Sequence, residues 1–359
     1  MSNTAYIGLF IEDYMKTMVR RSGMMLPEII KFHPTSSADA IQTANMVRKY
    51  YGAGQQMVKI SEDMFELLLR TDMKGVTAED LKLPYECLGF IMPHPHTIEV
   101  GPNIPPIPTN TVYLRSRFEG EIPSEISQRL GLDGAHLILD PDEIGRLMEQ
   151  KGVTQEEINE SLALGFLVFV GAMHGEYAAT SWVGFGKKEL DRAASGSGES
   201  LEDIITEKVD TVEQVSGNRT AYLTKKTAED DFFKAMKVAM NAVVYLNHGL
   251  DTKLLQRRDD KAYKEYTRLF ATTNSESKRR TYGRKITRIA RPTVRLIGPD
   301  IKRGRVGQEA PSDVMVRGHW HTYWVGKGRT ERKLNWVQPY VRNKTKDIEP
   351  ADEPRVYKV

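Results

Sequence analysis

The segment LALGFLVFVGAMHGEYAATSWVGF, residues 162–185, is the part of the chain that the sequence assigns most clearly to a buried core. It contains two apolar runs, 162–172 and 176–185, rich in aromatic and β-branched residues. Short runs of this kind on either side of a turn are typical of core strands paired as a hairpin, and His174-Gly175 supplies the turn. The sequence therefore predicts a body built around a β-sheet.

The segments around this hairpin predict helices and strands without a regular alternation, which indicates an α+β fold. The proline-rich segment 93–108 is expected to be a connection, because proline excludes helix there. No internal repeat is found, which argues against solenoids and propellers. Helices are expected at 38–52, 61–70, 228–247 and 254–269, and further strands at 83–92 and 111–117.

The composition is that of an ordinary soluble protein, with 40% hydrophobic and 28% charged residues in 359. No apolar run approaches the roughly twenty residues of a membrane span, and the N-terminus lacks the pattern of a signal peptide. The single cysteine, Cys87, excludes an internal disulfide and a thiolate-rich zinc site. We therefore expect a cytoplasmic protein.

The net charge of the chain is +3, but the charged residues are distributed unevenly along it. Residues 251–359 carry 27 lysines and arginines against 13 acidic residues, whereas residues 1–250 carry 24 against 35. Eleven cations lie between Lys278 and Arg305, with Asp300 as the one acid. Such a run is typical of a surface that binds a polyanion. The alternatives are that it docks on the acidic part of the same chain or is simply solvated.

A second distinctive segment is MVRGHWHTYWVGKGRTERKLNWVQPY, residues 315–340, with three of the four tryptophans, two histidines and five basic residues against one acid. Gly326-Lys327-Gly328-Arg329 is typical of a hairpin tip between strands at 315–325 and 332–341. The sequence thus predicts a mixed helical and β body with a basic, aromatic β-ribbon near its C-terminus.

The histidines of this segment are two residues apart. In a strand, period-two alternation places His319 and His321 on one face with Arg317 and Tyr323. His319, His321 and Arg317 are therefore candidate catalytic residues of a metal-independent ribonuclease, in which they would move a proton from a ribose hydroxyl and stabilise the phosphorane. A structural or peptide-binding role and metal binding stay open as alternatives.

Candidate RNA-binding residues combine cations for phosphates with aromatic rings for stacking on bases. For the tryptophans, core packing is the alternative. The candidates are Arg279, Arg280, Arg284, Arg288, Arg291, Lys327, Arg329, Trp320, Tyr323, Trp324 and Trp336.

The charge split suggests three parts: an acidic α+β body at 1–273 with a possible role in peptide recognition, a basic region at 274–345, and a mobile tail at 346–359. The motifs of P-loop NTPases, serine hydrolases, zinc proteases and dinucleotide-binding proteins are absent from the sequence. We therefore expect no cofactor and no metal.

The register Arg317-Gly318-His319-Trp320-His321, followed by Tyr323-Trp324 and by Trp336 and Pro339, resembles the C-terminal signature of a type V-A anti-CRISPR family. The segment Leu83-Pro84-Tyr85-Glu86-Cys87 shows a second, weaker resemblance to the same family. The resemblance implies a phage- or plasmid-borne counter-defence protein that recognises the nascent effector nuclease of a type V-A CRISPR system and brings about loss of its mRNA.

The partners implied by this resemblance are the nascent polypeptide of a host defence protein and RNA or the ribosome in the bacterial cytoplasm, without a membrane. The peptide would be bound by the acidic body or by residues 83–92. Two other readings remain open, a non-catalytic RNA- or DNA-binding regulator of a mobile element and the ribonuclease described above.

Overall fold

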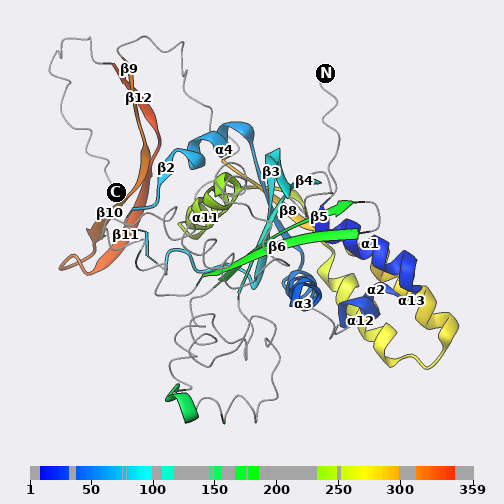
Figure 1. Ribbon diagram of the computed structural model, residues 1–359. Coiled ribbons are helices and arrows are strands. Elements are labelled where there is room, and N and C mark those ends of the chain that lie inside the picture. Colours follow the sequence, from blue (N-terminus) through cyan, green and yellow to red (C-terminus); the bar gives the residue numbers. More distant parts are fainter. Residues whose placement is uncertain are drawn as a thin grey trace, which may run out of the picture.

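The computed structural model describes residues 9–31, 38–74, 76–77, 79–98, 107–116, 146, 149–154, 166–174, 177–185, 192, 233–248, 252–298 and 313–343. The expected tail at 346–359 lies outside these residues, as do Asp300 and the cations Lys302, Arg303 and Arg305. The fold is α+β, as the sequence predicts (Figure 1).

The described helices are α1 (Phe10–Ser22), α2 (Leu26–Lys31), α3 (Ala38–Gly52), α4 (Glu62–Leu69), α11 (Phe233–Asn247), α12 (Asp260–Thr272) and α13 (Glu276–Ile289). The described strands are β1 (Gln56–Ile60), β2 (Thr71–Asp72), β3 (Cys87–Ile98), β4 (Ile107–Ser116), β5 (Phe166–His174), β6 (Tyr177–Phe185), β7 (Thr252–Gln256), β8 (Thr293–Ile297), β9 (Asp313–Val316), β10 (Gly318–Val325), β11 (Glu331–Val337) and β12 (Tyr340–Asn343). None of the described helices has the length and apolar character needed to cross a bilayer.

Seven of the described strands form one sheet in the order β6-β5-β4-β3-β1-β8-β7. Strand β1 is parallel to both of its neighbours, β3 and β8, whereas the remaining pairs are antiparallel. The hairpin expected from residues 162–185 is β5 paired with β6, at one edge of this sheet. The other edge is β7.

Both faces of the sheet are covered, which explains why its central strands are apolar runs. Val58 and Phe90 contribute to the core beneath α4 and α11, whereas Met57 and Tyr113 contribute to the core beneath α1, α3 and the α12–α13 pair. A side chain at Gly89 would collide with Met57 and Tyr113, so the second core depends on glycine there. Figure 1 shows the two helical layers on opposite sides of the sheet.

Capping residues explain where several helices begin. The Ser61 hydroxyl accepts a hydrogen bond from the Met64 N–H at the start of α4, and the Asp259 carboxylate accepts one from the Ala262 N–H at the start of α12. Side-chain oxygens at this position satisfy amides that the helix itself leaves unpaired. Helix α4 matches the prediction for 61–70 closely, and α3 has the predicted bounds of 38–52.

Three sequence-based expectations are corrected. Residues 254–269 are not one helix, because Thr252–Gln256 pair with β8 as a strand and the helix begins only at Asp260. Strand β3 continues to Ile98 into the segment expected to be a connection. The proposed boundary between 1–273 and 274–345 does not separate two folding units, since β8 lies inside the sheet between β1 and β7.

The β10–β11 hairpin is attached to the body through Asn241, a fully buried residue of α11. Its amide nitrogen donates to the Leu68 and Thr71 carbonyl oxygens at 3.2 and 3.4 Å, and its amide oxygen accepts the Trp320 indole N–H at 2.8 Å. Buried polar groups are costly unless they are paired, so this one side chain holds three separate segments in register.

We expect Asn241→Ala to lower the free energy of unfolding by about 2–4 kcal/mol, because it leaves the buried Trp320 N–H and two carbonyl groups without their partner. Urea denaturation followed by circular dichroism measures the effect. The control is Asn335→Ala on the exposed side of β11, for which we expect a change within about 0.5 kcal/mol. Equal effects of the two substitutions would contradict the anchoring role of Asn241.

Candidate nucleic-acid interface

The β10–β11 hairpin has one face in the core and one face in solvent. The two strands pair antiparallel, with His321 opposite Asn335 and Tyr323 opposite Lys333, and all four side chains are exposed. Trp320, one residue from His321, is only 3% exposed. This alternation follows from the two-residue repeat of a strand and separates a polar outer face from a buried aromatic face.

The outer face carries the three candidate catalytic residues, Arg317, His319 and His321, all of them exposed. None of these three side chains makes a hydrogen bond or ion pair within the described part of the chain. These side chains are therefore open to a ligand on the outer face of the hairpin.

The tryptophans of the hairpin divide between core and surface. Trp320 and Trp336 stack with their ring centroids 6.2 Å apart, and Trp336 donates its indole N–H to the Thr71 hydroxyl at 3.1 Å. Trp320 is therefore not available to stack on a base, which corrects its assignment to the RNA surface, whereas Trp336 is partly buried and packs against Trp320. Trp324, by contrast, is 55% exposed, and Tyr323 is 39% exposed.

The tip of the hairpin is a tight turn with exposed cations. Gly326 and Gly328 both have φ of +81°, and the Arg329 N–H donates to the Gly326 carbonyl oxygen at 3.0 Å. Lys327 and Arg329 are exposed. Arg329 itself has φ of +54°, a backbone conformation that residues other than glycine seldom adopt. Together with Tyr323 and Trp324, these cations provide both groups that a single strand of nucleic acid requires.

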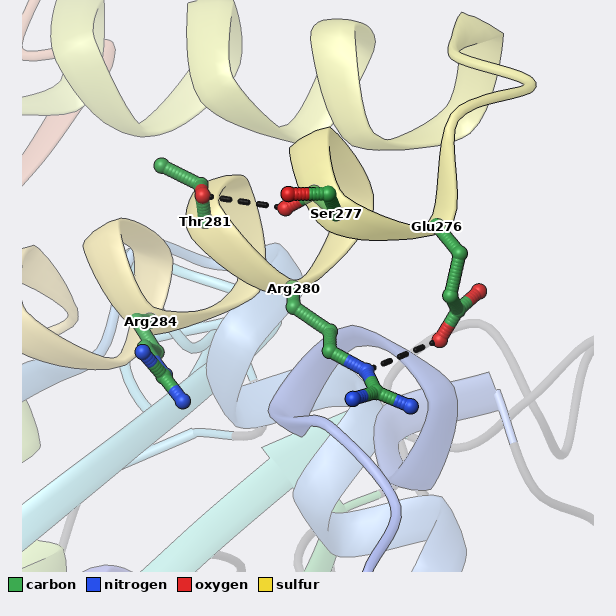
Figure 2. A pocket seen from close by; sticks show the side chains of 5 residues that line it. All are labelled: Glu276, Ser277, Arg280, Thr281 and Arg284. Atoms are coloured by element: carbon green, nitrogen blue, oxygen red, sulfur yellow. Dashed lines mark hydrogen bonds and ion pairs between the residues drawn. The ribbon is translucent and has the colours of Figure 1, made fainter.

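Helix α13 carries a row of arginines on its outer side. Arg280, Arg284 and Arg288 are spaced by four residues, so they lie along one helical face, and all three are exposed. Figure 2 shows Arg280 and Arg284 at a surface hollow that is also lined by Glu276. Glu276 pairs with Arg280 at 3.1 Å, whereas Arg284 and Arg288 make no ion pair within the described part of the chain.

Arg279 has a structural environment that differs from those of its neighbours. Its guanidinium group pairs with Glu28 of α2 at 3.0 Å and lies over the ring of Phe270 at 4.8 Å from the centroid. It thus ties α13 to α2 and α12, and it is the least available of the five candidate arginines. Arg291 is exposed in the segment between α13 and β8.

The two groups of candidate RNA-binding residues do not form one continuous surface. The α12–α13 pair and the β10–β11 hairpin lie at opposite ends of the molecule (Figure 1). The continuous basic arm suggested by residues 278–305 is replaced by a helix, α13, followed by a sheet strand, β8. A polyanion that touched both groups would have to span the body.

Sequence reasoning missed the ion pair that orients the hairpin. The Asp80 carboxylate is 6% exposed and accepts two hydrogen bonds from Nη1 of Arg332, both at 2.9 Å. It also accepts bonds from the Thr77 N–H and hydroxyl, and His248 Nε2 lies 3.4 Å from it. The one signal available was the Thr77-to-Asp80 spacing, which is typical of a side chain that closes a turn.

Much of the segment at 83–92, considered from the sequence as a peptide-binding pocket, lies in the core. Leu88, Phe90 and Met92 are at most 2% exposed and belong to the core of the sheet. Cys87 is also buried, and burial raises the pKa of its thiol to about 12. Pro84 and Glu86 of the same segment are exposed, so peptide binding there stays a prediction that involves these residues and not the buried ones.

No cluster of three or more histidine, cysteine, aspartate or glutamate side chains suited to a metal ion is found among the described residues. His319 and His321 have no carboxylate close enough to pair with them in that part of the chain.

The chain is similar to one protein family and to a solved structure. A family model named AcrVA2-like, described as the anti-CRISPR type V subtype A2 family, matches residues 58–344. A solved structure titled "Crystal structure of AcrVA2" is similar over 94% of this chain and 95% of that chain, with 12% sequence identity and a TM-score of 0.32. A search of curated proteins gives no match. The family match runs from β1 through the last described strand, β12.

The double substitution Arg284→Glu and Arg288→Glu should weaken binding to single-stranded RNA and lower its salt dependence, because each lost phosphate contact removes about 0.7 from the slope of log K against log salt. Fluorescence anisotropy with a labelled RNA at several salt concentrations measures both quantities. The matched control places the same charge change at Lys59 and Lys151, which are exposed and lie outside both candidate surfaces. An unchanged affinity and slope in the α13 variant would remove this helix from the interface.

Proposed function

The chain belongs to the anti-CRISPR type V subtype A2 family, and from that membership we propose that it recognises the nascent chain of a type V-A effector nuclease and promotes degradation of the encoding mRNA. As a member of this family it is an anti-CRISPR counter-defence protein. Its proposed mode of action is supported by the exposed cationic row on α13 and by the exposed aromatic and cationic residues at the tip of the β10–β11 hairpin.

The observation that carries the proposal is the pairing of exposed cations with exposed aromatic rings at the end of the hairpin. Lys327 and Arg329 suit phosphates, while Tyr323 and Trp324 suit unstacked bases. Ribosomal RNA and the message both offer these groups to a protein bound near an emerging peptide. The row on α13 would add sequence-independent attraction to the same polyanions.

Recoding the target gene separates recognition of peptide from recognition of RNA. One version of the effector gene carries synonymous codons, so the peptide is kept and the nucleotides change. A second is shifted by one nucleotide after the start codon, so the nucleotides are kept and the peptide changes; a third lacks the start codon. We expect the protein to lower the mRNA level of the synonymous version several-fold and to leave the other two unchanged, as measured by quantitative reverse transcription in bacteria.

The opposite pattern, in which mRNA loss follows the nucleotides and not the peptide, would contradict nascent-chain recognition. It would favour the second reading, a regulator that binds RNA or DNA without catalysis. Co-expression of the Arg284→Glu, Arg288→Glu variant reports in the same assay whether the cations of α13 contribute.

The ribonuclease reading rests on the shared outer face of Arg317, His319 and His321. We expect purified protein to bind labelled RNA in a salt-sensitive manner without cleaving it in the presence of a chelator. His319→Ala and His321→Ala should weaken binding with a nearly unchanged melting temperature, since the side chains are exposed. Asn335→Ala, on the same face, is the matched control.

Cleavage that resists the chelator and disappears in both histidine variants, with the melting temperature retained, would instead establish a metal-independent ribonuclease. A marked fall in melting temperature would favour the structural reading of the histidine pair.

A further inference from the structure

Strand β7 forms an edge of the seven-stranded sheet and is exposed along its whole length. It pairs with β8 on one side, and no described strand pairs with it on the other. The outer side of such a strand presents main-chain N–H and C=O groups to which another strand can bind. Strand β7 is therefore a template for one more extended segment.

Two leucines make this edge unusual. Leu254 is 51% exposed and Leu255 is 47% exposed, and both are among the largest exposed apolar side chains of the described residues. The register with β8 shifts between Leu254 and Gln256, so Leu255 has no cross-strand partner. Exposed edges in soluble proteins usually carry charge in place of large apolar side chains. An added strand would give both leucines a surface to pack against.

The charges that flank the leucines indicate what kind of segment fits. Lys253 and Arg257 are exposed and make no ion pair within the described part of the chain. A second copy of this protein pairing antiparallel through the same edge would bring four of these cations together, which is unfavourable. A segment with acidic residues on either side of apolar ones would instead complement the edge.

We propose that the β7 edge binds an extended polypeptide segment whose apolar side chains are flanked by acidic residues, and that this segment adds to the sheet as a further strand. Main-chain hydrogen bonds would supply affinity, and Leu254 and Leu255 would supply selectivity. The proposal rests on the proposed function for the identity of its partner, a nascent chain, which is extended and unpaired as it emerges from the ribosome.

Overlapping 15-residue peptides that tile the effector nuclease are the probes, each labelled with a fluorophore and titrated with the full-length protein. We expect peptides with the stated pattern to bind, and the variant Leu254→Ser, Leu255→Ser to weaken that binding at least about tenfold. Lys253→Glu, Arg257→Glu should weaken it too, and most at low salt. The control is Lys82→Glu, Lys151→Glu, a charge change of the same size at exposed residues outside β7 and both candidate RNA-binding surfaces, which should leave peptide affinity unchanged.

Amide hydrogen exchange gives an independent location for the bound peptide. We expect slower exchange within residues 252–256 when the peptide is present, and circular dichroism of each variant verifies that it is folded. Peptide binding that survives both β7 variants and leaves exchange in β7 unchanged would overturn the assignment while nascent-chain recognition stands. Absence of binding by any peptide would overturn both. A β7 variant that changes the mass in light scattering from dimer to monomer would show that the edge is occupied by a second copy, contrary to the proposal.

Discussion

The parallel pairing of β8 with β1 determines where the cationic part of this protein lies. Residues 293–297 align with residues 56–60, more than two hundred positions earlier in the chain, and β7 then pairs with β8. Because β8 lies inside the sheet, α13 must pack against the same body that the acidic first part of the chain builds. The uneven charge of the sequence therefore describes two surfaces of one fold and not two separable domains.

Two buried polar side chains fix the position of the β10–β11 hairpin on the body. Asn241 ties the Trp320 ring to the end of α4, and Asp80 binds Arg332 on the partner strand. Each of these side chains is buried, so the cost of leaving one unpaired favours a single position of the hairpin. The anchored face of the hairpin is buried and aromatic, so the histidines and the residues of the tip are exposed.

The arrangement suggests how peptide and RNA contacts can coexist. Strand β7 ends at Gln256, and α12 begins at Asp260, so the proposed peptide edge leads directly into the helical pair that carries the arginine row. A nascent chain and the surrounding RNA would thus meet one contiguous segment of this protein. The hairpin lies at the opposite end of the molecule, where its aromatic tip would meet a different stretch of polyanion (Figure 1).

Several individual strands, helix ends and turns could be predicted from the sequence. The apolar run at 162–185 predicted β5 and β6, Ser61 predicted the start of α4, and the glycines at 326 and 328 predicted the turn of the last hairpin, because periodicity, capping and turn chemistry act between near neighbours. The signature around His319 likewise pointed to the family that matches residues 58–344. Only the tertiary structure decided that Trp320 belongs to the core, that Arg279 and Arg332 are held by Glu28 and Asp80, and that Leu254 lies on an exposed strand. Those outcomes depend on contacts between residues far apart in the chain, and such contacts are set by packing and by the pairing of buried polar groups, which no local pattern records.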